Sequence, residues 1–245
     1  MKNQKYDKLY RHPLYLLISK DINEIAKLTI DNKDEGRTIV NSRQYFVTKI
    51  MYPFFEISDK LKSLHISISL IKNYSISKEL REFITREEYI TYHLEYYFIS
   101  QIALFDRVLH LCNITYDLGL SDRYVTYDVV KNNSNVSNEC KTALKVFNDY
   151  LEKKEIRKTQ NKIKHKEKLI DKEMYRAALF EVVSRDLAGE NTKDLKEASL
   201  LYYKEYLKVK KGEMTVEIKE LEGFVINVFN ALYPNIEREY RNIKL

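Results

Sequence analysis

Residues 85–113 have the sequence TREEYITYHLEYYFISQIALFDRVLHLCN, and this stretch decides the fold class. Thr85 and Glu88 form a capping box, in which each side chain accepts a hydrogen bond from the backbone N–H of the other residue. A single stripe then follows at the three- and four-residue spacing of one helix face. Its members are Ile90, Leu94, Tyr97, Gln101, Leu104, Val108 and Leu111. The pattern predicts a long helix that ends at Gly119, because glycine suits a left-handed cap.

The sequence before this helix has helical periodicity as well. Residues 1–33 are predicted to form a helical entry to the fold, with a turn at residues 32–36. A second helix is predicted over residues 41–71, and we expect Pro53 to kink or divide it. Apolar and polar residues alternate over residues 66–70, so a short strand is the alternative there, but the helix is favoured.

Helices are also predicted after a polar, exposed loop at residues 119–136. The first begins near Ser137 and buries one apolar face. That face consists of Cys140, Leu144, Phe147 and Leu151. The next helices are predicted over residues 156–170, 172–188 and 194–210. Gly212 is expected to break the chain before a final helix around residues 221–232, which Pro234 stops or bends.

The composition supports an all-α fold and limits the kind of protein. Five glycines and three prolines in 245 residues are too few for a turn-rich β fold. Cys112 and Cys140 lack metal-site spacing, which favours a reduced, cytoplasmic location and no metal or other cofactor. Residues 1–11 lack the apolar core of a signal peptide, and the apolar runs are too short to span a bilayer. No membrane association is therefore expected.

The net charge of the chain is concentrated in one segment, residues 153–172. This segment contains nine Lys or Arg and three acidic residues, a net charge of +6. The whole chain also has a net charge of +6, so the remaining residues are balanced. A polyanion is the natural partner of such a basic patch, although a solvated helix face is the ordinary alternative.

Within this segment, Arg157, Asn161 and His165 are four residues apart and share one helix face. An imidazole can transfer a proton near neutral pH, and a guanidinium can hold a phosphate through two hydrogen bonds. An amide between them can orient the phosphate or the imidazole. With RNA as substrate, the 2′-hydroxyl can be the nucleophile, and no metal ion is needed. These residues therefore predict phosphodiester chemistry, with an exposed histidine of no function as the alternative.

Residues 161–165, Asn-Lys-Ile-Lys-His, resemble the last part of the Arg-Asn-x-x-x-His signature of the HEPN superfamily. Residues 104–113, continuing to Gly119, resemble a helix of the Cthe-type branch of that superfamily. The resemblance covers most of the chain after residue 85. It implies an all-α bundle, with the signature at the start of a helix and a homodimer in which two signatures face one shared cleft. It also implies RNA or nucleotide binding, or metal-independent RNA cleavage by a bacterial toxin or anti-phage protein.

The sequence departs from this signature at the arginine, which is Gln160 here. Arg157 lies one turn earlier and is the candidate replacement, and Lys158 provides a second positive charge. We therefore expect Arg157, Asn161 and His165 to be the catalytic residues. The predicted RNA-binding residues are Lys158, Gln160, Lys162, Lys164, Lys166 and Arg107.

Two further groups of side chains are candidates for the site. Asp106, His110 and Asn113 share a face and form either a second wall of the cleft or, as we favour, a buried polar network. The tyrosines can stack on bases or can belong to a helix surface or dimer interface. They are Tyr89, Tyr92, Tyr96 and Tyr97.

The predicted organisation is a helical extension over residues 1–84 that packs on a HEPN-like domain over residues 85–245. The alternative function is a HEPN-fold scaffold without catalysis, of antitoxin type, that binds a partner protein or RNA.

Overall fold

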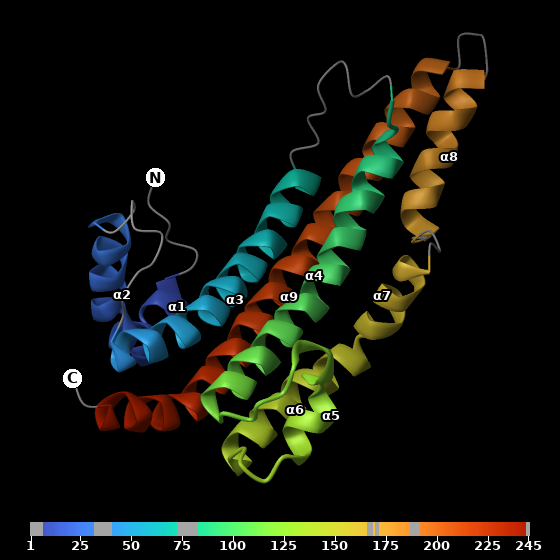
Figure 1. Cartoon of the computed structure of the whole chain (residues 1–245). Helices are drawn as coiled ribbons and strands as arrows, with labels where there is room; N and C mark the ends of the chain where they lie inside the picture. The colour runs from blue at the N-terminus through green and yellow to red at the C-terminus, as the bar shows by residue number, and fades with distance from the viewer. Residues whose placement is uncertain are drawn as a thin grey trace. The chain divides into compact units, whose positions relative to one another are not determined.

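The computed structural model describes residues 7–31, 41–72, 83–165, 169, 172–186 and 192–243. Every regular element within these residues is helical, so the predicted all-α fold is confirmed (Figure 1). The α-helices are α1 (Asp7–Tyr10), α2 (Pro13–Asp31), α3 (Ser42–Lys72), α4 (Arg86–Thr115), α5 (Tyr127–Asn132), α6 (Asn138–Lys153), α7 (Ile156–Lys164), α8 (Lys172–Asp186) and α9 (Thr192–Asn242). One 3₁₀ helix, η4 (Asp122–Tyr124), precedes α5.

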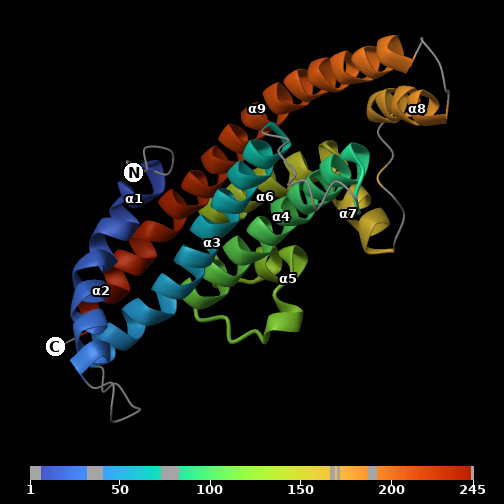
Figure 2. The ribbon, with the colours of Figure 1, turned by 90° about the horizontal axis from the view of Figure 1, so that it is seen from above.

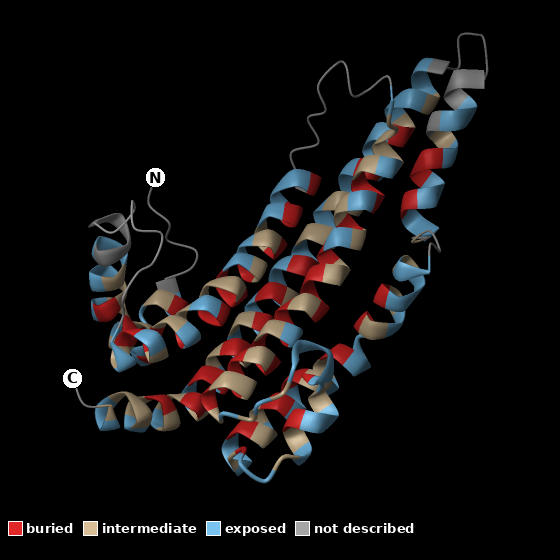
Figure 3. Cartoon of the chain, in the orientation of Figure 1, coloured by how far each residue is buried: buried red, intermediate tan, exposed pale blue. Residues whose placement is uncertain are grey.

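The chain divides into two compact units. The first unit comprises Met1–Lys62, Ala103–Lys153 and Leu221–Leu245, and the second comprises Ser63–Ile102 and Lys154–Glu220. Helices α3, α4 and α9 each contribute residues to both units. Buried positions recur along these long helices (Figure 3).

Aromatic rings form much of the core of the first unit. Phe54 stacks on Phe229 with ring centroids 5.5 Å apart, and Phe147 contacts Phe105 and Phe224 at 4.9 and 5.3 Å. Helix α2 lies along the C-terminal part of α9 (Figure 2), where the His12 ring bonds to Asn230 at 3.0 Å. Burial of these rings removes apolar area from water and so stabilises the unit.

Helix α4 begins as predicted but ends earlier than predicted. Thr85 N donates to Glu88 Oε2 (2.7 Å) and Glu88 N donates to Thr85 Oγ1 (3.1 Å), which confirms the capping box. The left-handed residue at the helix end is Asp117 (φ 46°), and Leu118 N bonds to Asn113 O at 3.0 Å. Gly119 is left-handed as predicted (φ 66°), but it lies two residues beyond Asp117, so the predicted position of the helix end is wrong. An aspartate tolerates the left-handed region better than most residues, so a glycine is not required at this position.

Helix α3 continues through Pro53, so the predicted division at this residue is wrong. The helix also includes residues 66–70, and the alternative of a strand is excluded. Phe54, Ile57 and Leu61 are completely buried on the C-terminal side of the proline. Their burial offsets the roughly 3 kcal/mol that proline costs inside a helix. The turn predicted at residues 32–36 lies outside the described residues.

Helix α9 continues through Gly212, and the break predicted there is wrong. A Cβ atom added at Gly212 would meet nothing within 4 Å, and glycine costs about 1 kcal/mol relative to alanine inside a helix. Met214 and Ile218 on the C-terminal side are buried, as is Tyr203 on the N-terminal side. Packing on both sides therefore outweighs the weak helix propensity. Pro234 also lies inside α9, so it does not stop this helix.

The region between α4 and α6 is more ordered than predicted. Residues 119–136 contain η4 and α5, and Val125, Val130 and Val136 are buried beneath an otherwise exposed surface. The apolar face predicted for α6 is confirmed, because all four of its members are completely buried. One of them, Cys140, has its Sγ atom 3.7 Å from that of Cys112.

Candidate functional site in helix α7

Helix α7 begins directly after a residue with left-handed backbone geometry. Glu155 precedes α7 in the left-handed region, with φ 51° and ψ 26°. One turn apart, Ile156 and Gln160 are buried, with exposed fractions of 1% and 7%. This buried side directs the opposite side of α7 to solvent. The exposed residues of α7 and its cap, named here the α7 face, are Lys158, Asn161, Lys162, Lys164 and His165.

Polar contacts of the second unit hold both ends of the α7 segment. Lys154 Nζ lies 3.7 Å from Glu217 Oε1, and the Tyr97 hydroxyl donates to Glu217 Oε2 at 3.0 Å. The side chain of Glu217 therefore joins α4 and α9 to the start of α7. Beyond α7, Leu169 N donates to Glu95 Oε1 of α4 at 3.3 Å. No sequence pattern predicts the role of Glu217, because 120 residues separate it from Tyr97.

His165 is the cap at the C-terminus of α7. Its backbone N–H bonds to Asn161 O at 3.0 Å, and its side chain is exposed. The helix ends at Lys164, so the predicted helix over residues 156–170 was too long. The resemblance had implied a signature at the start of a helix, whereas residues 161–165 form the last turn and cap of α7. Lys162 and Lys164 in that turn interact favourably with the negative end of the helix dipole.

The cations predicted for RNA binding lie in different environments. Arg157 is half-buried, and Lys158 Nζ lies 3.2 Å from Glu155 Oε1 in an exposed pair. Such an exposed pair contributes at most about 1 kcal/mol, so a phosphate can replace the carboxylate. Lys162 and Lys164 have no carboxylate within 4 Å among the residues that the structure describes. Lys166 is outside the described residues.

Arg107 belongs to the first unit, where its Nη1 lies 3.3 Å from Glu56 Oε2. Near it on α4, Asn113 bonds to both backbone groups of Leu120, at 2.9 and 3.1 Å. His110 Nδ1 is 3.8 Å from Asp122, and Asp106 is exposed. Instead of the favoured buried network between helices, Asn113 fixes the loop that follows α4.

A comparison with protein families identifies the fold. The Cthe2314-like HEPN family (HEPN_Cthe2314) matches residues 56–228, which is more than half of the chain. The chain belongs to this HEPN family. The resemblance found in the sequence is thereby confirmed at the level of the superfamily. Searches of curated proteins and of solved structures found no match.

In this HEPN chain the four candidate tyrosines of α4 have different roles. Tyr97 is 1% exposed and donates to Glu217 and to Met214 O, so its role is structural. The Tyr89 hydroxyl donates to Leu70 O at 3.4 Å. Tyr92 is 66% exposed and Tyr96 is 38% exposed, which leaves these two rings accessible to a ligand.

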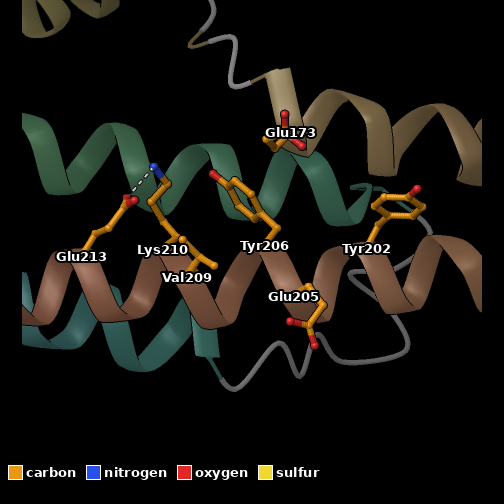
Figure 4. Close-up of a pocket in the computed structure, with 7 residues that line it drawn as sticks. All are labelled: Glu173, Tyr202, Glu205, Tyr206, Val209, Lys210 and Glu213. Carbon is orange, nitrogen blue, oxygen red and sulfur yellow. Dashed lines mark hydrogen bonds and ion pairs between the residues drawn. The ribbon is translucent and has the colours of Figure 1, made fainter.

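A groove of about 380 Å³ runs along α9 beside the start of α8 (Figure 4). Its lining consists of Glu173, Tyr202, Glu205, Tyr206, Val209, Lys210 and Glu213. The described lining contains three glutamates and one lysine, Lys210, which pairs with Glu213 at 3.1 Å, so the net charge of this lining is negative. None of the signature residues lines this groove, and its charge does not suit a phosphate.

The described part of the HEPN chain has no group of three or more His, Cys, Asp or Glu side chains placed to hold a metal ion. Within the same residues, no helix has the length and apolar character needed to cross a membrane.

Proposed function

We propose that this HEPN chain binds RNA through the α7 face and cleaves it without a metal ion. The observation that carries the proposal is the exposure of Asn161 and His165 beside Lys158, Lys162 and Lys164. These side chains combine a proton-transfer group with several cations on a surface open to solvent. Phosphates of RNA are the natural ligands of such a surface.

In the proposed reaction, His165 removes the proton of a 2′-hydroxyl, and the 2′-oxygen forms a bond to the adjacent phosphorus. The bond from phosphorus to the 5′-oxygen breaks, and a proton from solvent neutralises that leaving oxygen. The products are a 2′,3′-cyclic phosphate and a 5′-hydroxyl end. Asn161 orients the phosphate, while Arg157 and Lys158 offset the negative charge that develops on it.

The burial of Gln160 favours a second candidate function, a HEPN scaffold that binds RNA or a partner protein without cutting. Gln160 occupies the position of the signature arginine, is uncharged and faces the inside of the unit. Loss of a group that stabilises the transition state typically lowers the rate about 100- to 1000-fold. An antitoxin-like partner of an active HEPN protein belongs to this second candidate.

The experiment measures cleavage of single-stranded RNA in excess EDTA. For the first candidate, cleavage persists with EDTA and yields cyclic phosphate ends. His165→Ala then lowers the rate at least about 100-fold. His110→Ala is the matched control, because this histidine lies in the first unit, and it leaves the rate unchanged. Equal rates for His165→Ala and the unchanged chain contradict the mechanism, and RNA binding without cleavage supports the scaffold.

We also propose that the protein is a homodimer, and α8 supports this. Met174, Ala177 and Ala178 are buried within the second unit, yet another side of α8 exposes four apolar side chains. They are Tyr175, Leu179, Val182 and Val183. A helix with two apolar sides is normally covered on both. Light scattering is expected to give a molar mass of twice that of the chain. Val182→Glu is expected to reduce the measured mass to that of a monomer. Val146→Glu on α6 is the control and is expected to leave the dimer mass unchanged.

A bacterial toxin or anti-phage role in the cytoplasm is the biological setting that we propose for RNA cleavage. Expression of the chain in bacteria is then expected to slow growth, and His165→Ala is expected to restore it. Slow growth with both chains would contradict a toxic effect through this histidine.

A further inference from the structure

Over residues 204–219 of helix α9, a row of lysines lies on one side of the helix and two glutamates lie on another. Lys204, Lys208 and Lys211 follow one side at spacings of four and three residues, and Lys219 continues the row. Glu205 and Glu213 lie on another side and line the groove of Figure 4. The lysine row therefore follows a different side of α9 from the side on which Glu205 and Glu213 line the first groove.

The lysine row borders a second groove, of about 560 Å³, which we name the lysine groove. Its described lining is Lys204, Leu207, Lys208, Lys211, Gly212 and Thr215. No carboxylate is among these described lining residues. The apolar surface comes from Leu207 and from the aliphatic stems of the lysines, which remain beside the helix while the ammonium groups reach solvent.

The charges of the lysine row, which includes Lys219 beyond the groove, are little neutralised by the protein. Among the described residues, Lys204, Lys211 and Lys219 have no carboxylate within 4 Å. Lys208 lies 3.9 Å from Glu205, in a pair whose lysine is 77% exposed. Such a contact is long and screened by solvent, so all four ammonium groups are available to an anion.

Gly212 indicates that the occupant of the groove comes close to the helix. This glycine lowers the helix propensity of α9, yet no positive φ requires it. A Cβ atom at this position would meet only open space, so packing within the chain does not require glycine either. Its place in the lining leaves the backbone of α9 accessible, and glycine serves this purpose where a ligand approaches a backbone closely.

We propose that the lysine groove binds the phosphate backbone of single-stranded RNA. The inference rests on the proposed RNA function and assigns a second contact surface to the unit that contains α7. From Lys204 to Lys219 the row is about 22 Å long at 1.5 Å per residue, which suits a linear polyanion. The apolar floor suits the sugars and bases of an unpaired strand, and lysines act here as point charges without base preference.

The test is a salt titration of binding to a fluorescein-labelled single-stranded RNA. All chains also contain His165→Ala, so that the RNA stays intact. Replacing Lys204, Lys208 and Lys211 together by Gln is expected to make the plot of log association constant against log salt concentration less steep. The magnitude of its negative slope is expected to fall by about 2, at roughly 0.7 per phosphate contact. The matched control replaces Lys62, Lys141 and Lys145 of the first unit by Gln, and its slope is expected to be unchanged.

A second pair of variants tests the close approach of the RNA. Gly212→Ala is expected to weaken RNA binding severalfold, because a methyl group then projects into the groove. Gly223→Ala is the matched control, since a Cβ there also meets nothing within 4 Å and this residue does not line the groove. Unchanged affinity in Gly212→Ala overturns the approach of RNA to the helix backbone.

The outcomes separate this inference from the proposed function. If the parent chain binds RNA and both triple lysine variants have the same salt-dependence slope, RNA does not bind in the lysine groove. The proposal of RNA binding through the α7 face is not affected by that result. Absence of RNA binding by the parent chain overturns both proposals. Binding to vesicles of phosphatidylserine and phosphatidylcholine is measured as well, with the same lysine variants. If the lysine triple abolishes vesicle binding but leaves RNA binding unchanged, the ligand is an anionic lipid surface and the RNA assignment is overturned.

Discussion

Helices α6 and α7 are neighbours in the chain, but they are held in place in different ways. Helix α6 buries Cys140, Leu144, Phe147 and Leu151 completely, so packing fixes it along its whole length. Helix α7 buries few side chains, and polar contacts hold the two ends of its segment. A continuous apolar face therefore holds a helix against the core along its length. A helix that is held mainly at its ends can present most of its surface to a ligand.

The largest effect is expected from a substitution that disrupts the packing of α6. Phe147→Ala removes a completely buried ring that contacts two others, and it is expected to lower the free energy of unfolding by about 3–5 kcal/mol. Ile163 of α7 is half-buried, and Ile163→Ala is the comparison variant. It is expected to lower the free energy of unfolding by less than half as much. Urea unfolding measures both values. Similar losses for the two variants would show that α7 is packed as firmly as α6.

A smaller effect is expected from the polar attachment of α7. Glu217→Ala removes the acceptor of the Tyr97 hydroxyl and the partner of Lys154, at a cost of about 1–3 kcal/mol. Hydrogen exchange is expected to become faster in α7 but not in α6. Glu220→Ala, an exposed carboxylate on the same helix, is the control. Equal acceleration of exchange in α6 would contradict an attachment specific to α7.

Acid is expected to weaken each unit through a different histidine. Burial lowers the pKa of His12 in the first unit, although its bond to Asn230 partly opposes this, and burial also lowers the pKa of His93 in the second unit. A lowered pKa in the folded state means that unfolding takes up a proton. The associated stability is complete above about pH 6.5 and is lost as the pH falls through the folded pKa.

The variants His12→Gln and His93→Gln separate these two contributions. Hydrogen exchange measured as a function of pH is expected to lose part of its acid sensitivity around α2 in His12→Gln and around α4 in His93→Gln. An acid response that neither variant changes would remove both histidines from the explanation.

The smallest effect is expected at the junction between the two helices. Glu155 has a left-handed backbone that costs a non-glycine residue about 1 kcal/mol, while glycine increases the entropy of the unfolded chain. The two terms nearly cancel, so Glu155→Gly is expected to change stability by less than about 0.5 kcal/mol. Lys154→Gly has no such relief and is expected to destabilise the protein clearly in the same urea titration.

The sequence predicts helices well where apolar side chains recur, and less well where helices end. The buried face of α6 and the capping box of α4 were both correct, because each depends on residues close together in the chain. Gly212 and Pro53 were given too much weight, since long-range packing outweighs local propensity. At the α4 terminus, the choice between Asp117 and Gly119 depended on backbone hydrogen bonds that a sequence does not reveal.

The sequence selects the residues of the candidate site, and their role stays a prediction, but the sequence does not reveal their structural surroundings. Charge concentration and four-residue spacing selected the segment around Asn161 and His165, and the family match includes this segment. The buried side of Gln160 and the helix end at Lys164 depend on tertiary packing. Glu217 joins residues far apart in sequence, and a pattern search within single helices does not find such a contact.

The adjacent thiols of Cys112 and Cys140 give this protein a built-in reporter of unfolding. The contact with Cys140 and, after it, burial raise the pKa of Cys112, so this thiol stays protonated and inert to alkylating reagents in the native state. The chain contains no tryptophan, and the usual intrinsic fluorescence signal of unfolding is therefore missing. Mass spectrometry of iodoacetamide-treated samples can take its place, because each alkylated Cys112 records one opening of the first unit.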